Sequence, residues 1–276
     1  MKVRIETRVL FPELEREFKV QPISREWAKM LVPDPLKTVP LDKFPRLEVI
    51  STPSTGTNHI DLKECERRGI KVKSLLDDRE GLSEIRASSE FALFMILSGL
   101  RLGGFRQWKT YNRNAEAMLG RELYGKQVGI VGFGRIGQNI AKWVSAMGAK
   151  WRSYDYGSGE DALLSIFGEC DIILISMNLN EKSFELIGDQ HLSRMKKGAI
   201  LVNVARAEII KESALNFYAT KGMNYVTDVL HREVDGNVTS PLLNLPNVIV
   251  YPHLAGHALE ANEKAMRIAL RLLRDG

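Results

Sequence analysis

The chain has 276 residues, of which 44% are hydrophobic and 26% charged, values typical of a globular protein with one large or two ordinary domains. Its net charge of +5 comes from scattered basic residues, without a basic run interleaved with aromatics, so we expect no nucleic-acid partner. The apolar stretches are too short for a signal peptide or a membrane span, and we expect a cytoplasmic protein with no membrane contact.

The first ~85 residues predict a small α/β unit. Two apolar runs of strand length, at 47–51 and 70–72, flank a segment of helical spacing at 60–68 that stops at Gly69. Four prolines predict that residues 33–45 are mostly loop. An amphipathic helix over 259–273 has the spacing to pack back on this unit.

Residues 125–253 alternate between apolar runs and segments of helical spacing, which predicts a parallel sheet with helices on both faces. A helix over about 86–100 links this part to the first unit. We therefore predict two domains, a Rossmann-type doubly wound sheet over 87–256 and a smaller α/β domain formed by 1–86 with 257–276. The expected strands are 128–131, 151–154, 172–176, 199–204, 225–229 and 248–251, and the expected helices are 136–147, 161–167 and 212–220.

A glycine-rich turn follows the first strand of this sheet and opens a helix. Gly132 allows the tight turn, Gly134 leaves room for a pyrophosphate, and Gly137 lets the helix pack close to the strand. The helix N-terminus, at Arg135 and Ile136, supplies N–H groups and a positive dipole end to phosphates. The turn therefore predicts a dinucleotide site.

Asp155 ends the next strand, where an acid would hydrogen-bond a ribose 2′-hydroxyl. A carboxylate there repels a 2′-phosphate, and the following residues, 156–159, offer no basic group for one. The cofactor we expect is therefore NAD rather than NADP.

Polar residues also follow the other predicted strands. In a parallel sheet the carboxyl ends of all strands meet at one edge, where ligands bind. The residues at or just past these ends are Gly132, Asp155, Ser176, Arg206, Asp228 and His253.

Arg206, Glu233 and His253 form the candidate catalytic trio. Arg206 can hold a carboxylate by a two-pronged, charge-assisted hydrogen bond. His253 suits proton exchange because imidazoles titrate near neutral pH, and Glu233 can orient the ring. Neither Cys65 nor Cys170 lies in a Cys/His cluster, so we expect buried thiols and no metal site.

At this point the sequence resembles the D-isomer-specific 2-hydroxyacid dehydrogenase family, from about residue 47 to the C-terminus. The shared segments are S-T-G-T-N-H-I-D at 54–61, S-E-F-A at 89–92, E-L-Y-G-K at 122–126, M-K-K-G-A-I-L-V-N-V-A-R at 195–206, D-V at 228–229, N-V at 247–248 and P-H at 252–253.

The resemblance implies roles for individual residues. Arg206 would bind the substrate carboxylate together with the backbone of Thr55 and Gly56, and Glu233 would pair with His253 as the general acid/base. Asp228 would lie near the nicotinamide amide. Further cofactor contacts are implied for Ser176, Val204 and Ala205.

The resemblance also implies a flavodoxin-like substrate domain and a homodimer through the cofactor domain, to which an apolar arm between Trp108 and Leu119 would contribute. Three features depart from the family pattern. Ala207 stands where the family usually has glycine, Ser176-Met177-Asn178 replaces a His-x-Pro segment, and the N-terminal unit is short.

The expected reaction is oxidation of a D-2-hydroxy acid to a 2-oxo acid with NAD, in either direction. Two alternatives stay open. One is a non-catalytic NAD(H)-sensing interaction protein on the same scaffold. The other is a dehydrogenase of another small anion, such as phosphite.

Overall fold

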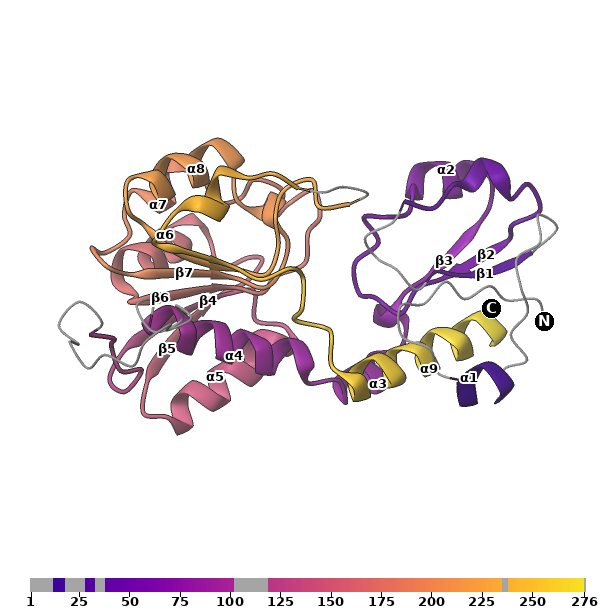
Figure 1. The fold of residues 1–276 in the computed structure, drawn as a ribbon, viewed down its shortest axis with the longest axis horizontal. Helices are drawn as coiled ribbons and strands as arrows, with labels where there is room; N and C mark the ends of the chain where they lie inside the picture. Colours follow the sequence, from indigo (N-terminus) through magenta and orange to yellow (C-terminus); the bar gives the residue numbers. More distant parts are fainter. Residues whose placement is uncertain (1–11, 18–27, 33–37, 102–118, 235–237, 276) are drawn as a thin grey trace, which may run out of the picture. The chain divides into compact units, whose positions relative to one another are not determined.

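The computed structural model describes residues 12–17, 28–32, 38–101, 119–234 and 238–275 (Figure 1). The chain divides into two compact units. The first comprises Met1–Ala87, Arg232–Asn237 and Gly256–Gly276, and the second comprises Ser88–His231 and Val238–Ala255. The short segment around Glu233 thus groups with the first unit, although most of the chain around it belongs to the second.

The second unit contains a six-stranded parallel sheet with the order β5-β4-β6-β7-β8-β9. Its strands are β4 (Gln127–Val131), β5 (Lys150–Tyr154), β6 (Ile172–Ile175), β7 (Ile200–Asn203), β8 (Asn224–Thr227) and β9 (Val248–Val250). Each lies within two residues of the range that its apolar run predicts. The chain runs outward from β4 to β5 and then returns to the other side of β4 for β6, so the order of the strands reverses there.

Helices cover both faces of this sheet, because the strand residues that point to either face are apolar. Ile172 and Leu174 of β6 pack in a core with helices α4 (Ala87–Leu100) and α5 (Arg135–Ala146). Ile173 and Ile175 pack in a second core with α6 (Glu160–Glu169), α7 (Asp189–Leu192) and α8 (Glu212–Thr220). Figure 1 shows these two helical layers on opposite sides of the sheet. The predicted doubly wound sheet is confirmed.

The first unit is built on a smaller parallel sheet, β1-β2-β3, formed by β1 (Lys29–Leu31), β2 (Val49–Ser51) and β3 (Lys71–Lys73). The C-terminal helix α9 (Leu259–Asp275) packs on one face together with α1 (Pro12–Glu17), through a core that includes Leu31, Val49 and Leu270. The Ser51 hydroxyl also donates to the carbonyl of Ala269 at 2.8 Å. The C-terminal helix therefore does pack back on the first unit, as its amphipathic pattern predicts.

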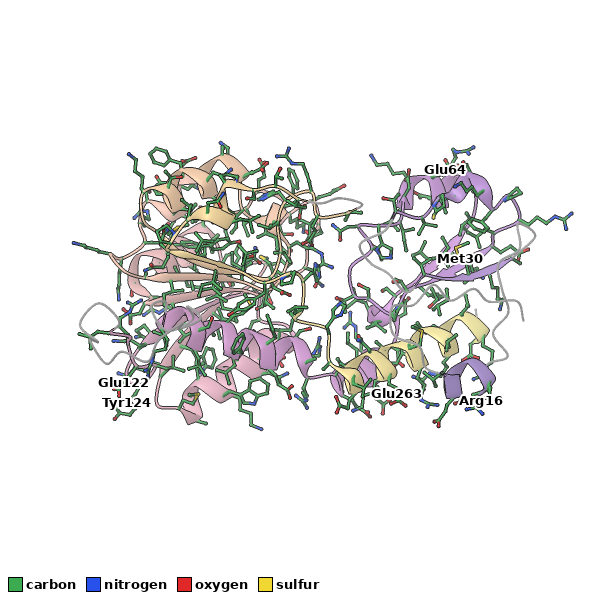
Figure 2. The ribbon with its side chains drawn as sticks, in the orientation of Figure 1. Arg16, Met30, Glu64, Glu122, Tyr124 and Glu263 are labelled. Atoms are coloured by element: carbon green, nitrogen blue, oxygen red, sulfur yellow. The ribbon has the colours of Figure 1, made fainter. Side chains whose placement is uncertain are left out.

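The opposite face of the small sheet contacts α2 (Leu62–Arg67). Met30, Ile50 and Cys65 belong to this core, and Figure 2 shows Met30 inside it while Glu64 lies on the outer side of α2. The short helix α3 (Arg79–Ser83) completes the unit, with 3-10 turns at Leu41–Lys43 and Leu75–Asp77. β1 and α1 were not expected from the sequence, unlike β2, β3 and α2, which are equally short.

Both cysteines are buried and free. Cys170 has no exposed surface, and burial raises the pKa of its thiol to about 11. Burial also raises the pKa of Cys65. Because only a thiolate reacts readily, both side chains act as small hydrophobic groups, as expected.

His191 is a buried histidine with two hydrogen bonds, and it is 1% exposed. Its Nδ1 accepts the backbone N–H of Gly188 at 3.2 Å, and its Nε2 lies 2.9 Å from a carboxylate oxygen of Glu160. Burial lowers the pKa of His191, and the nearby Glu160 carboxylate only partly opposes this effect. The neutral imidazole is the form that the fold accommodates, since Nδ1 must stay free of a proton to accept the Gly188 N–H.

The lowered pKa makes the stability of the fold depend on pH. The unfolded chain binds a proton at His191 more tightly than the folded chain does, so the contribution to stability is full above about pH 6.5 and declines as the pH falls toward the folded-state pKa. We expect His191→Gln to flatten the fall in the free energy of unfolding between about pH 7.5 and pH 5. Urea titrations at several pH values measure both slopes, and equal slopes would contradict this account.

Candidate active site

The glycine turn lies where the strand order reverses, between the carboxyl ends of β4 and β6. Gly132 has φ +98°, and a Cβ there would come within 2.5 Å of the backbone nitrogen of Met177. The Ser176 hydroxyl donates to the carbonyl of Gly132 at 2.8 Å and ties the two strand ends together. Only glycine fits at position 132, because of both its backbone conformation and this close approach.

The other two glycines of the turn differ in what surrounds them. A Cβ at Gly137 would lie 2.3 Å from the carbonyl oxygen of Gly132, so helix α5 approaches the turn as closely as backbone atoms allow. A Cβ at Gly134 would meet nothing within 4 Å. Gly134 is the N-cap of α5, with Arg135 and Ile136 in its first turn, and no side chain caps this end. The open space beside this helix N-terminus fits a bound pyrophosphate.

Asp155 follows β5 directly, and its carboxylate is linked to the glycine turn. One oxygen accepts the N–H of Phe133 at 3.2 Å, and the other accepts the N–H of Tyr156 at 2.9 Å. These bonds hold a negative charge beside the turn, in the place where a ribose hydroxyl would bind.

The segment that replaces the family's His-x-Pro pattern is connected to the same region. The Tyr156 hydroxyl accepts a bond from the Asn180 amide at 2.8 Å and donates to the carbonyl of Asn178 at 3.3 Å. The Ser183 hydroxyl donates to the same Asn178 carbonyl at 2.7 Å. The loops after β5 and β6 are therefore joined by Tyr156 in this chain.

Arg206 lies three residues beyond the end of β7 and is half-buried. Asn203, the last residue of β7, is completely buried and shapes the turn that carries Arg206. Its side-chain oxygen accepts the N–H of Ala205 at 2.9 Å, and its amide donates to the carbonyl of Arg206 at 3.0 Å. Val204 and Ala205 complete the turn. The sequence analysis did not single out Asn203, although a polar residue at the end of an apolar strand is a usable signal.

Ala207, which stands in place of the usual glycine, causes no backbone strain. It begins a 3-10 turn, Ala207–Ile209, and is not among the residues with positive φ. Its methyl group is buried, so the change from glycine fills space in the core.

His253 lies three residues beyond β9 and adopts a left-handed backbone conformation, with φ +56°. Its N–H donates to the carbonyls of Asp228 and Tyr251, at 3.1 and 3.0 Å. The Tyr251 ring packs edge-on against Phe91 of α4, with 5.2 Å between centroids. The loop is therefore fixed on both sides of the histidine.

Asp228 follows β8 directly and is 1% exposed. Its two carboxylate oxygens accept the N–H groups of Leu254 and Ala255, at 2.7 and 2.8 Å. These bonds are charge-assisted and lie away from water, so they hold the loop after His253 firmly.

The strand ends thus bring together the residues that the sequence analysis expects at one edge. Gly132, Asp155, Ser176 and Asp228 come immediately after parallel strands, and Arg206 and His253 come within three residues. Glu233 is half-buried and belongs to the first unit.

Thr55 and Gly56 also belong to the first unit, on the loop after β2. The Gly56 N–H donates to the Ser54 hydroxyl at 3.1 Å, and the N–H of Leu75 donates to the Ser54 carbonyl at 3.0 Å. To bind a carboxylate, the Gly56 N–H would have to share or leave its bond to Ser54.

In the described part of the chain, no group of three or more His, Cys, Asp or Glu side chains is arranged to hold a metal ion. None of the described helices is both long and apolar enough to cross a membrane.

The sheet, the glycine turn and the anchored Asp155 define the class of a dinucleotide-dependent α/β enzyme. The chain matches the NAD-binding domain of the D-isomer specific 2-hydroxyacid dehydrogenases over residues 95–255. It matches the catalytic domain of the same family over residues 30–76. The chain therefore belongs to the D-isomer specific 2-hydroxyacid dehydrogenase family, and it is an NAD-dependent dehydrogenase.

Individual relatives agree with this assignment. The chain is 30% identical to glyoxylate reductase of Korarchaeum cryptofilum, over 85% of this chain and 74% of the relative. It is 30% identical to hydroxypyruvate reductase of Thermotoga maritima, over 79% of this chain and 74% of the relative. Among solved structures, the TT0316 protein of Thermus thermophilus superposes with a TM-score of 0.78 at 25% identity, covering 99% of this chain and 96% of that one.

The different surroundings of Gly134 and Gly137 predict different effects of the same substitution. We expect Gly137→Ala to lower the free energy of unfolding by about 1–3 kcal/mol, because its methyl group would overlap the backbone of the turn. Gly134→Ala should leave stability nearly unchanged and weaken NADH binding, because its methyl group would occupy the open space. Thermal melts and NADH fluorescence titrations separate the two effects. Equal NADH affinity in Gly134→Ala and the unchanged protein would contradict the second expectation.

Proposed function

We propose that this protein interconverts a D-2-hydroxy acid and a 2-oxo acid, with glyoxylate or hydroxypyruvate as the preferred oxo acid. The observation that carries the proposal is the arrangement on strands β7, β8 and β9. Arg206 and His253 follow the outer two of these neighbouring strands, on the sheet edge that also carries the glycine turn. The named activities of the glyoxylate and hydroxypyruvate reductases support this choice of substrate.

Each residue has a proposed role in the reaction. NAD, when bound, supplies the hydride chemistry at C2 of the substrate. Arg206 binds the substrate carboxylate and orients C2, since a guanidinium matches a carboxylate in charge and shape. His253 takes the proton from the C2 hydroxyl during oxidation and returns it to the oxo oxygen during reduction.

From the first unit, we propose that Glu233 orients the imidazole of His253. The backbone at Thr55 and Gly56 is proposed to bind the substrate carboxylate. We propose that the cofactor is contacted by the glycine turn and by Ser176, Val204, Ala205 and Asp228.

The proposed cofactor preference rests on Asp155. Its carboxylate lies beside the glycine turn, and the residues that follow it, Tyr156 to Gly159, carry no positive charge. A 2′-phosphate in that position would face a negative group, and the four residues after Asp155 supply no cation to offset it. NADH should therefore be preferred over NADPH.

We also propose that the protein forms a homodimer through the second unit. Leu119 and Tyr124 are 83% and 74% exposed there, and Figure 2 shows Tyr124 beside Glu122 on the outer side of that unit. Most of the expected dimer arm, between Trp108 and Leu119, lies outside the described residues. Sedimentation velocity tests the homodimer, since a monomer at micromolar concentration would contradict it.

We also propose that the enzyme is located in the cytoplasm, where thiols stay reduced.

The substrate assignment is tested by NADH oxidation with glyoxylate, hydroxypyruvate, pyruvate, phenylpyruvate and longer 2-oxo acids, each repeated with NADPH. We expect the highest kcat/KM with glyoxylate or hydroxypyruvate and NADH. Inactivity with every oxo acid, together with tight NADH binding, would favour a sensor protein. Oxidation of phosphite with NAD, without activity on any oxo acid, would favour a dehydrogenase of another anion. A preference for NADPH over NADH would contradict the role of Asp155.

The role of His253 is tested by His253→Ala. Loss of a general acid/base lowers kcat by about 10²–10⁴-fold, and we expect a loss in this range for reduction of the best oxo acid. NADH binding, measured by fluorescence, should stay within about threefold of the unchanged protein, because the side chain is not needed for the cofactor. Turnover at the original rate would remove His253 from the mechanism.

A further inference from the structure

Two buried polar side chains, Asn203 and Asp228, hold the turns that carry Arg206 and His253. Asn203 ends β7, and Asp228 follows the neighbouring strand β8. They are 0% and 1% exposed, although neither residue type is commonly buried to this extent. Burial of such groups requires nearby hydrogen-bond partners, and in both cases the partners are backbone groups of a site turn.

The contacts of Asn203 determine the path of the chain up to Arg206. The amide oxygen accepts the N–H of Ala205, and the amide nitrogen donates to the carbonyl of Arg206. The two ends of one side chain therefore bond the peptide group between Val204 and Ala205 and the peptide group that follows Arg206. These bonds restrain the backbone that carries Arg206, and the guanidinium itself donates to the carbonyl of Ala205 at 2.7 Å.

Asp228 holds the backbone of the His253 loop in a similar way. Its main-chain carbonyl accepts the N–H of His253, and its carboxylate accepts the next two N–H groups, of Leu254 and Ala255. Three successive N–H groups thus point at one residue. This arrangement accounts for the left-handed backbone of His253, which a residue with a side chain rarely adopts without such support.

The two anchors are joined to each other. The N–H of Asp228 donates to the carbonyl of Asn203 at 3.1 Å, which continues the hydrogen-bond ladder between β7 and β8. We call this unit of Asn203, Asp228 and the bond between them the strand-end brace. The brace runs without interruption from the Arg206 turn to the His253 loop, and its two side chains lie in the interior.

We infer that the strand-end brace is a positioning device, which holds Arg206 and His253 at a fixed separation. Asn203 is a positioning residue that acts through Arg206. Asp228, which is proposed above to contact the cofactor, has a second role here and positions His253. The inference rests on the proposed function, because it assigns to the brace the spacing between the group that binds the carboxylate and the group that transfers the proton.

The first test compares Asn203→Ser with Asp228→Asn. Serine can still accept the Ala205 N–H but does not reach the Arg206 carbonyl, so we expect KM for the oxo acid to rise about tenfold while kcat changes by less than about threefold. Asparagine offers one acceptor oxygen where the carboxylate offers two, so the loop after His253 loses a bond. For Asp228→Asn we expect kcat to fall by roughly 10²-fold, with a smaller change in KM.

Asn247→Ser is the matched control. Asn247 also uses its amide to hold the chain, donating to the carbonyls of Ala219 and Met223 at 2.9 and 2.6 Å. It precedes β9 and therefore lies at the opposite edge of the same sheet. We expect Asn247→Ser to lower the melting temperature and to leave KM and kcat unchanged. Equal kinetic losses in Asn247→Ser and Asn203→Ser would show a general effect of instability and overturn the inference.

The double variant Asn203→Ser/Asp228→Asn tests whether the brace acts as one unit. Anchors that depend on each other should give a combined loss of kcat/KM smaller than the product of the two single losses. A loss equal to the product would show two independent turns and overturn the single brace.

Two further measurements keep the inference separate from stability and from the proposed function. In the unchanged protein, the amide hydrogens of Ala205, Leu254 and Ala255 should exchange slowly with solvent, and exchange as fast as in an exposed loop would overturn the brace even if the variants do not fold. Unaltered kinetics in both Arg206→Lys and His253→Ala would contradict the proposed function. Large losses in those two variants, with none in Asn203→Ser and Asp228→Asn, would overturn the brace alone.

Discussion

The parallel direction of six hydrogen-bonded strands is the constraint on which the second unit depends. In such a sheet every strand delivers its following residues to the same edge, so residues far apart in sequence meet there without any special contact. The reversal of strand order beside β4 places the glycine turn on this edge, between the ends of β4 and β6. The apolar residues on both faces of each strand then bury the sheet between two helical layers.

The edge is built from two kinds of hydrogen bond that do different work. The ladder bonds between strands place the turns, and buried side chains at the strand ends shape them. Asn203 and Asp228 are examples of the second kind, since each bonds backbone groups of a turn, and the half-buried Ser176 bonds the carbonyl of Gly132 in a similar way. A buried polar group with all its bonds made costs little and restricts the backbone strongly. The chain therefore uses its interior polar residues to fix the conformation of loops that would otherwise have several.

The sequence predicts the second unit well because its signals are long and repeated. Six apolar runs separated by helical segments leave few arrangements, and the glycine turn and Asp155 follow strands in the expected order. The first unit is predicted less completely, since β1 and α1 were not expected from the sequence. The role of Asn203 is only partly evident from the sequence, because a polar residue at the end of an apolar strand is a signal, but only the tertiary contacts decide whether its side chain is buried. Ala207 shows the reverse case, since the sequence raises a concern about backbone conformation that the 3-10 turn resolves.

The left-handed backbone of His253 has a consequence for how the protein tolerates change. A side chain at φ +56° is less favourable than glycine by about 1–2 kcal/mol, so the native fold is less stable than it would be with glycine at this position. Random substitution and selection for heat resistance alone would therefore favour His253→Gly, which removes the imidazole from that strand end. Under the proposed function of His253, stability and activity oppose each other at this single residue.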